Sequence, residues 1–151
     1  MASRGRTILG TTLTILAIGV MAFLLFVYSG WYDVSASTPH YGGVRWTLDA
    51  MTERSVAVRA DEVTPPAQYG EDLVAHGFDH YVAMCETCHG GVGVEAGEIG
   101  QGLNPQPPDL EDAAEEYTDA ELFWILKHGI KFTGMPAFGP THSDQELWGI
   151  V

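Results

Sequence analysis

The sequence predicts an all-α protein in which an N-terminal transmembrane helix precedes a small helical domain. Residues 7–32 contain no charged side chain, which favours a helix inside a membrane. Apolar residues recur at intervals of three and four in the C-terminal half, and two segments there begin with the Ser/Thr-x-x-Glu pattern that caps helices. We find no stretch that alternates apolar and polar residues, as a half-buried strand does, and no internal repeat.

The uncharged segment 7–32 is long enough to cross a bilayer. A helix of this length, at about 1.5 Å per residue, exceeds the roughly 30 Å of hydrocarbon in a membrane. Its centre is strongly apolar, and aromatic residues gather at its far end, where interfacial side chains belong: Tyr28, Trp31 and Tyr32. We therefore interpret this segment as a membrane anchor.

The charges on either side of the anchor predict its orientation. Arg4 and Arg6 precede it, and the first acid, Asp33, follows it. The positive-inside tendency then places residues 1–6 in the cytoplasm. We expect a single-pass protein of the cytoplasmic (inner) membrane, with its C-terminal domain on the periplasmic, extracytoplasmic side. The alternative is a cleaved signal peptide ending near Val34-Ser35-Ala36, but signal peptides usually have apolar regions of only about 7–15 residues.

The composition limits the classes of protein to which the chain can belong. Its 151 residues give room for one ordinary domain, or for a small domain with appendages. The formal net charge of −13 argues against a nucleic-acid-binding protein, because phosphate backbones attract Lys and Arg. A hydrophobic content of 46% excludes a disordered chain. Two cysteines are too few for a domain stapled by disulfides.

Residues 33–69 are expected to form a juxtamembrane spacer with one short helix, over 44–58. Val44, Leu48 and Met51 share a face of that helix at helical spacing. The helix could lie on the membrane or on a partner, or it could be a stalk with a small packing face. The short apolar stripe favours the stalk. Residues 61–70 contain Pro65-Pro66 and are interpreted as a linker.

Residues 70–151 are expected to form the compact domain. The spacing of apolar residues predicts a first helix over Glu71–Thr87. Capping patterns predict a helix from Thr118 to Gly129 and a last helix that starts at Ser143. The segment 90–117, between the first helix and the helix that starts at Thr118, is rich in Gly and Pro. Structureless segments of that length are uncommon in compact domains. It therefore needs something to wrap around.

The motif Cys85-Glu86-Thr87-Cys88-His89 is the attachment signature of c-type haem. In such a site the thiols of Cys85 and Cys88 form thioethers with the two vinyl groups of the porphyrin, and the next residue, His89, is the proximal ligand of the iron. We therefore predict one covalently attached haem c. The predicted export agrees with this, because bacteria attach haem to such motifs outside the cytoplasmic membrane.

The motif has three other possible interpretations. A thioredoxin-like site needs a βαβ pattern, which the sequence lacks. A structural zinc site needs four ligands, and Cys85, Cys88 and His89 supply three. A plain disulfide stays open. Elsewhere, His76 and His80 are spaced to share a surface metal, but no third ligand is near them in sequence.

Met135 is the predicted sixth ligand of the iron. It lies between Gly134 and Pro136, which permit a close and fixed approach of the backbone. Thioether sulfur binds haem iron, and a His/Met pair raises the reduction potential. The alternatives are His128 and His142, either of which would give a bis-histidine haem of lower potential.

The sequence resembles the class I cytochromes c, specifically the membrane-anchored bacterial monohaem members, over about residues 70–151. The matching features are Gly77 and Tyr81 before the attachment motif, Pro108-Asp109-Leu110 after the haem loop, and Thr133-Gly134-Met135-Pro136 as the methionine loop. The resemblance implies a small fold of three to four helices wrapped around one covalently bound haem.

The resemblance also implies roles for two further residues. The Pro108 carbonyl would accept a hydrogen bond from Nδ1–H of His89 and so fix the ligand ring. Leu110 would contact the haem ring. By residue type alone, the haem propionates have three candidate partners: Tyr117, Trp124 and Lys131.

The chain departs from the family pattern at its last helix. In the family that helix crosses the first, and an aromatic residue packs against the glycine that corresponds to Gly77. Here only Asp144–Val151 remain, and the aromatic position falls about two residues beyond the sequence. Either Trp148 takes its place or the sequence is a truncated form of a longer protein. We expect truncation.

We interpret the protein as an electron carrier that exchanges single electrons with redox proteins, and not as an enzyme. Iron with two protein ligands has no open position, so no small-molecule substrate is expected. The acidic surface predicts partners with a basic docking surface. Two alternatives stay open: a haem c subunit of a membrane dehydrogenase or oxidase complex, and a sensor or peroxidase-like enzyme in which Met135 dissociates.

Overall fold

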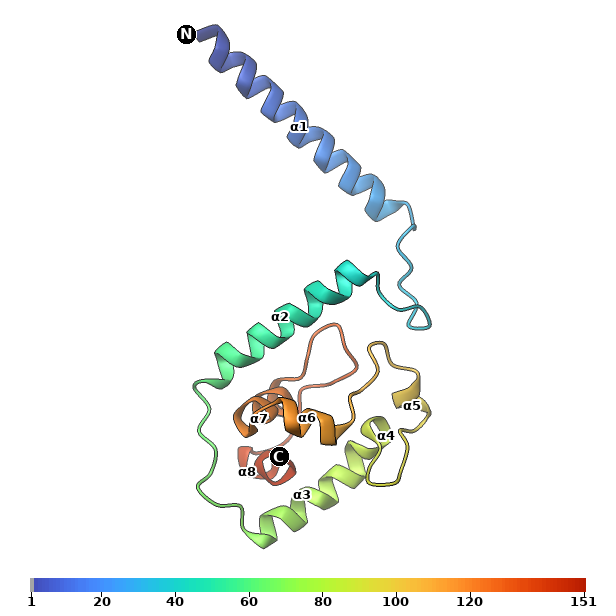
Figure 1. The fold of residues 1–151 in the computed structure, drawn as a ribbon, viewed down its shortest axis with the longest axis vertical. Helices are drawn as coiled ribbons and strands as arrows, with labels where there is room; N and C mark the ends of the chain where they lie inside the picture. Colours follow the sequence, from blue (N-terminus) through green and yellow to red (C-terminus); the bar gives the residue numbers. More distant parts are fainter. Residues whose placement is uncertain (1) are drawn as a thin grey trace. The chain divides into compact units, whose positions relative to one another are not determined.

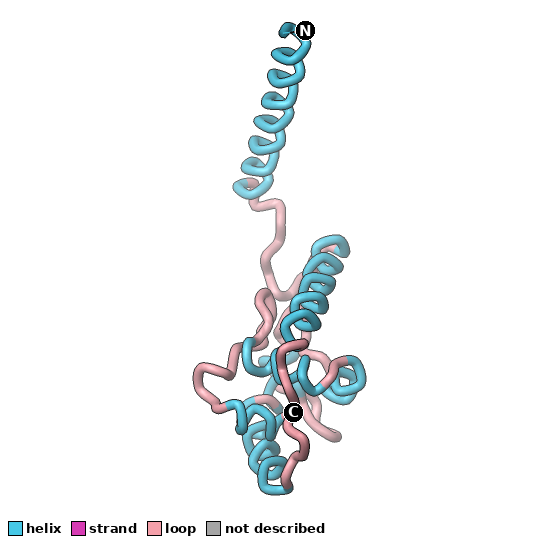
Figure 2. Tube along the Cα trace, turned by 90° about the vertical axis from the view of Figure 1, so that its left-hand side faces the viewer, coloured by secondary structure: helices cyan, strands magenta, loops and turns pink. Residues whose placement is uncertain are grey.

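A computed structural model describes residues 2–151; Met1, the first residue of the predicted cytoplasmic segment 1–6, lies outside that range. The described chain forms eight helices joined by turns and loops (Figure 1). No strand occurs among these residues (Figure 2), and the only bridge described among them pairs Gly91 with Val94. The predicted all-α fold is confirmed. The chain divides into two units, the residues up to Thr38 and a C-terminal unit of Pro39–Val151.

The first unit is dominated by α1, which runs over Ala2–Tyr28. Its stretch Arg4–Tyr28 has a mean hydropathy of 2.3 and is compatible with a single-pass membrane anchor. The helix ends four residues before the predicted boundary at residue 32. Ser29 donates its hydroxyl to the Phe26 carbonyl at 2.7 Å, and Gly30 adopts a φ of 68°, which the helix cannot continue.

The C-terminal unit contains the other seven helices, and its core lies where α7 and α8 meet. Phe123 and Leu126 of α7 are buried against Leu147 of α8. The ring of Trp148 stacks on Phe123 at 4.1 Å between centroids. The helices are α2 (Gly42–Ala60), α3 (Glu71–Met84), α4 (Glu86–His89), α5 (Glu98–Gln101), α6 (Leu110–Glu116), α7 (Asp119–His128) and α8 (Asp144–Ile150).

Helices α3 and α8 cross at two glycines. A Cβ built on Gly77 would lie 1.6 Å from the carbonyl oxygen of Gly149. A Cβ on Gly149 would lie 2.7 Å from the Leu73 carbonyl oxygen. The sequence predicted a close helix approach at Gly77, and this is confirmed. The partner there is the Gly149 backbone and not an aromatic ring, because Trp148 is turned away onto Phe123.

Helix α2 is longer than predicted and belongs to the C-terminal unit. Val56 and Ala60 are buried at 1% and 4% exposure, and α2 packs against α7. The segment predicted as a spacer thus shares one compact unit, Pro39–Val151, with the predicted domain. The predicted inner face, with Val44, Leu48 and Met51, was wrong, since Met51 is 62% exposed. The observed inner face contains Leu48, Thr52, Val56 and Ala60. The hydroxyl of Thr52 and the small side chain of Ala60 interrupt its apolar stripe, so the face was not evident from the sequence.

Two sequence expectations for the middle of the domain need correction. The helix predicted over Glu71–Thr87 is divided at Cys85, which ends α3 and precedes the short α4. The segment 90–117 is not wholly irregular, because it contains α5 and α6. The side chain of Asp109 caps α6 by accepting the Glu111 N–H at 2.9 Å.

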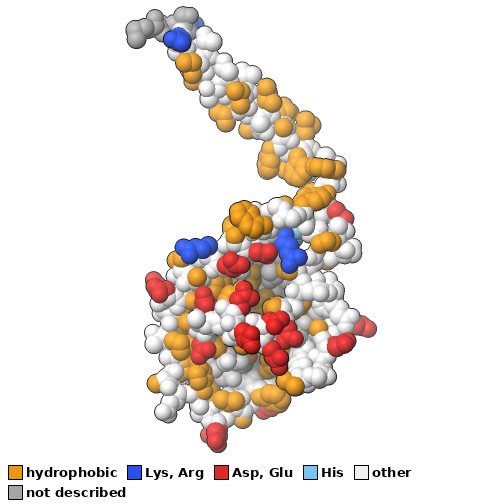
Figure 3. Space-filling view, viewed as in Figure 1, with side chains coloured by type: hydrophobic (Ala, Val, Ile, Leu, Met, Phe, Trp, Pro, Cys, Tyr) orange, Lys and Arg blue, Asp and Glu red, His pale blue; other side chains and the backbone are white. Residues whose placement is uncertain are grey.

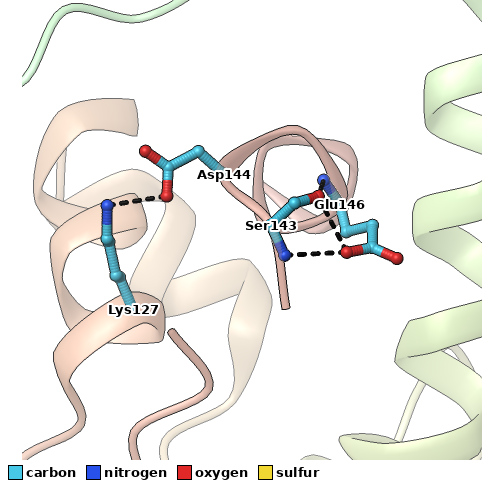
Figure 4. Close-up of polar contacts among 4 residues, drawn as sticks. All are labelled: Lys127, Ser143, Asp144 and Glu146. Carbon is cyan, nitrogen blue, oxygen red and sulfur yellow. Dashed lines mark hydrogen bonds and ion pairs between the residues drawn. The ribbon is translucent and has the colours of Figure 1, made fainter. Parts of the chain in front are cut away.

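The two predicted capping boxes are present. Thr118 caps α7 and Ser143 caps α8, each with the glutamate three residues later. The Ser143 cap stands beside an ion pair in which Lys127 Nζ of α7 lies 2.6 Å from a carboxylate oxygen of Asp144 (Figure 4). The pair is partly exposed and contributes at most about 1 kcal/mol.

Replacing Thr118 with alanine should destabilise the C-terminal unit by about 1 kcal/mol, because the hydroxyl that accepts the Glu121 N–H is lost. Guanidinium unfolding measures the change in free energy. The control is Thr64→Ala, at an exposed site between α2 and α3, which should change the stability by less than about 0.5 kcal/mol. Equal effects of the two substitutions would contradict a specific capping role.

Candidate functional site

The predicted site residues line one cavity of about 610 Å³ in the C-terminal unit. Small-molecule sites have volumes of about 300–1,000 Å³, so the cavity is of the size that a cofactor needs. Apolar side chains from α7 and from loops before and after it in the chain contribute to the wall, including Leu103, Leu122, Ile125, Leu126 and Ile130. The wall also contains the six residues predicted to hold the haem: Cys85, Cys88, His89, Pro108, Leu110 and Met135.

The attachment motif is positioned by the end of α3. The N–H of Cys85 donates to the Tyr81 carbonyl at 2.8 Å, and a single helical turn then carries Cys88 and His89. Both cysteines are free thiols, so the disulfide alternative is absent from the structure. Burial raises the pKa of the Cys85 thiol, and the neighbouring Cys88 adds to the rise. Because neither cysteine is in a disulfide, both sulfurs are available for thioether bonds.

The imidazole of His89 is oriented by the backbone of Pro108. Nδ1 lies 3.1 Å from the Pro108 carbonyl oxygen. A carbonyl oxygen only accepts, so Nδ1 carries the proton and Nε2 keeps its lone pair. This is the hydrogen bond that the resemblance predicts, and it leaves Nε2 free to bind a metal.

The chain after the motif folds closely over it. Gly90 adopts a φ of 69°, and its carbonyl accepts the Tyr81 hydroxyl at 2.6 Å. A Cβ on Gly100 would lie 2.4 Å from the Cys88 carbonyl oxygen, so only glycine permits this approach. The glycine-rich segment thus packs closely on the backbone of the attachment motif.

The loop that carries Met135 is held at several points. The Met135 N–H donates to the Thr133 hydroxyl at 3.1 Å. A Cβ on Gly129 would lie 2.8 Å from the Met135 carbonyl oxygen, and one on Gly134 would lie 2.6 Å from the Leu103 side chain. Met135 is half-buried and packs against the core between α7 and α8. These contacts fix a thioether in the wall of the cavity.

The alternative axial ligands lie elsewhere. Neither His128 nor His142 is among the residues that line the cavity. The His128 ring packs on Trp124 at 4.9 Å. His142 has Nδ1 at 3.3 Å from the Phe138 carbonyl, and its ring contacts that of His80 at 5.4 Å. Met84 does line the cavity, next to the attachment motif.

Two rival interpretations of the motif find no support in the part of the chain that the structure describes. Within residues 2–151, no group of three or more His, Cys, Asp or Glu side chains is placed to hold a metal ion, which counts against zinc and against a metal shared by His76 and His80. The absence of strands from the same range counts against a thioredoxin-like site.

Sequence reasoning missed the contribution of α2 to the site. Asp49, Thr52 and Glu53 line the cavity together with Tyr117. Of the three candidates for propionate contacts, Tyr117 lines the cavity, whereas Trp124 and Lys131 do not. Burial raises the pKa of the Tyr117 hydroxyl, and the carboxylates of Glu116 and Glu53 add to the rise. The signal for the docking of α2 was the repeat of small and apolar residues every four positions from residue 48.

The outer surface of the C-terminal unit is acidic. Figure 3 shows Asp and Glu side chains gathered over the visible face of this unit, with Lys and Arg few. The whole chain has 20 acidic and seven basic side chains. This surface repels anions and attracts cationic surfaces over roughly 10 Å at ordinary salt.

Comparisons with known proteins identify a family and a relative for this part of the chain. Residues 72–151, more than half of the chain, match the family model described as cytochrome C oxidase, cbb3-type, subunit III. The chain is also 33% identical over 89 residues to the dehydrogenase subunit of alcohol dehydrogenase (quinone) from Acetobacter aceti. That similarity covers 58% of this chain and 11% of the relative, so the chain matches only a small part of that protein.

Proposed function

The chain belongs to the family of cytochrome c oxidase, cbb3-type, subunit III, and from this premise we propose that it is a membrane-tethered protein that exchanges single electrons with redox partners. Its cytochrome c domain carries covalently bound haem c and has an electron-transfer role. Bound haem supplies an iron that cycles between the ferrous and ferric states. The residues of this chain determine how the haem is fastened, oriented and shielded.

We assign the haem-binding roles as follows. Cys85 and Cys88 form the thioether links, His89 provides the proximal nitrogen through Nε2, and Met135 provides the opposite thioether ligand. Pro108 holds the His89 ring through its carbonyl, and Leu110 contributes apolar wall. The observation that supports this assignment is that all six residues line one cavity, in which His89 Nδ1 is already bonded to Pro108.

The apolar helix α1 supports a fixed location at a membrane. We propose that it is a retained single-pass anchor of the cytoplasmic membrane and that the haem domain lies on the periplasmic side. Arg4 and Arg6 at the start of α1 favour this orientation, as does haem attachment outside the cytoplasm. A tether raises the effective concentration of the haem domain beside partners in the same membrane.

The acidic surface supports a partner with a basic docking patch. Complementary charge speeds encounter and orients the two proteins, and its effect falls with salt. Electron exchange with such a partner should slow as the ionic strength rises.

A second candidate function is a haem c subunit fixed within a dehydrogenase or oxidase complex. It is favoured by the descriptions of the family and of the similar protein, both of which refer to subunits of larger enzymes. A stable complex purified in mild detergent from the native membrane favours the subunit. Purification of the chain alone with full electron-exchange activity favours the carrier. A third interpretation, a sensor or peroxidase-like enzyme, requires Met135 to dissociate from the iron. The close backbone contacts of the Met135 loop disfavour this movement.

Covalent haem is the expected result that tests the function. The mass of the denatured full chain, expressed in a host that attaches haem, should exceed the mass of the polypeptide by one haem. Acid–acetone extraction should leave the pigment on the chain. After proteolysis, the haem should stay on the peptide that contains residues 85–89. Extraction of all iron pigment, or a mass equal to that of the bare polypeptide, would refute the proposal.

A further inference from the structure

We propose that α2 forms one wall of the haem site and that the carboxylates of Asp49 and Glu53 lower the reduction potential of the haem held there. The proposal rests on the proposed function, because it concerns the same cavity. It goes beyond the ligand set, because α2 precedes residues 72–151, which match the family.

The first support is the attachment of α2 to the domain. Val56 is 1% exposed and Ala60 is 4% exposed, and α2 lies beside α7 in the C-terminal unit (Figure 1). Removing the Val56 and Ala60 side chains from water favours the docked position of the helix. The helix is therefore a fixed part of the C-terminal unit and not a free stalk.

The second support is the placement of polar side chains along the cavity. Asp49, Thr52 and Glu53 stand three and four residues apart, so they share one face of α2, and all three line the cavity. The same cavity is lined by Cys85, Cys88, His89 and Met135. Carboxylates and haem-binding residues therefore line the same cavity.

The third support is the electrostatic effect on a neighbouring group. Tyr117, between α6 and α7, lines the same cavity. Burial raises the pKa of its hydroxyl most, and among the nearby carboxylates Glu53 and Asp49 of α2 add to the rise. Asp49 is itself 56% exposed and paired with Arg45 at 3.6 Å, so its charge is partly screened. Glu53 should therefore contribute more than Asp49.

The direction of the effect follows from charge. Ferric haem carries one more positive charge than ferrous haem, so nearby carboxylates stabilise the ferric form and lower the potential. Removing the two charges should favour the ferrous form. The His/Met ligand pair raises the potential, and the acids of α2 would offset part of that rise.

The test compares two double variants of the full chain, each with haem attached, in detergent. D49N/E53Q removes two charges from the wall of the cavity. D61N/E62Q removes two charges from the turn that directly follows α2, at exposed residues that do not line the cavity. The two variants thus have the same net charge.

Spectroscopic redox titration should distinguish them. At a fixed applied potential, D49N/E53Q should raise the ratio of ferrous to ferric haem about threefold or more, where tenfold corresponds to about 59 mV for one electron. D61N/E62Q should change the ratio less than half as much, and salt should shrink the difference between the variants. Equal shifts in both variants, or no shift in either, would overturn the proposal.

Hydrogen exchange provides a second test that does not depend on charge. In the haem-loaded protein, the backbone of α2 around Val56 should exchange about as slowly as that of α7. Rapid exchange of α2 beside a protected α7 would overturn the proposal, since a loose helix forms no wall. A chain that carries no covalent haem would instead refute the proposed function, so the two failures are distinguishable.

Discussion

Replacing Gly77 with alanine should destabilise the C-terminal unit by about 3 kcal/mol. The new Cβ would lie 1.6 Å from the carbonyl oxygen of Gly149 and 2.0 Å from its carbonyl carbon. These are backbone atoms and cannot turn aside, so α3 and α8 must separate. Overpacking of a well-filled contact costs about 1–3 kcal/mol, and a clash with backbone belongs at the upper end. Guanidinium unfolding of the haem-loaded protein measures the loss.

Gly43 supplies a matched control for this substitution. It also lies in a helix, near the start of α2, but a Cβ built there meets nothing within 4 Å. Alanine has a better helix propensity than glycine by roughly 0.8–1 kcal/mol, so Gly43→Ala should leave the stability equal or slightly increased. If Gly77→Ala were as harmless as Gly43→Ala, the helix crossing would be looser than the structure describes.

The loss at Gly77 should extend to the haem site, because both crossing helices lead to it. α3 ends at Cys85, the first attachment residue. α8 carries Leu147, which is buried against Phe123 and Leu126, and Met135 packs on that cluster. Separation of α3 from α8 therefore loosens both sides of the cavity. The crossing holds the attachment motif and the methionine loop at a fixed separation.

Local signals explain which elements were predictable from the sequence. The apolar helix α1 follows from the lack of charge over residues 7–32, and α7 and α8 follow from capping patterns at Thr118 and Ser143. Each of these signals is contained in one short segment. The cap of α6 at Asp109 was readable in the same way but was hidden by the surrounding Gly and Pro residues.

The docking of α2 could not be predicted in the same way. Its inner face contains Thr52 and Ala60 beside Val56. These side chains form too short an apolar stripe to predict burial from the sequence, and the face is recognised only from the packing of α2 against α7. The contribution of α2 to the cavity is a property of tertiary packing, and the periodicity within the segment pointed to a different face. Helix propensity and apolar periodicity are weak predictors of which face of a helix is buried when tertiary packing determines it.

The candidate site was predictable in part for a similar reason. The spacing of Cys85, Cys88 and His89 is itself the chemical requirement for attachment, so the motif is readable without a fold. The contact between His89 and Pro108 joins residues 19 apart, and only the resemblance to a known family indicated it. Met135 was favoured by its flanking residues, and the structure brings it to the same cavity.

Replacing Met135 with alanine should lower the reduction potential and open the iron to external ligands. Methionine ligation raises the reduction potential of a His/Met haem, so loss of the thioether ligand lowers it. At a fixed applied potential, the ratio of ferrous to ferric haem should fall at least tenfold, or about 59 mV for one electron. The weak red absorption band of iron–methionine sulfur should disappear, and the reduced protein should bind carbon monoxide. Redox titration and absorption spectra measure these changes.

Met84→Ala is the matched control, because Met84 is also half-buried and lines the same cavity. It precedes Cys85 on α3, so its thioether should serve packing, and its loss should leave the red band intact. Met135→His should keep six ligands, exclude carbon monoxide and still lower the potential, which separates loss of sulfur from loss of a ligand. The loop should tolerate these changes, because the Thr133 hydroxyl accepts the backbone N–H of residue 135 and Gly129 packs on its backbone. An unchanged spectrum and potential in Met135→Ala would place the sixth ligand elsewhere, and the same loss in Met84→Ala would assign it to α3.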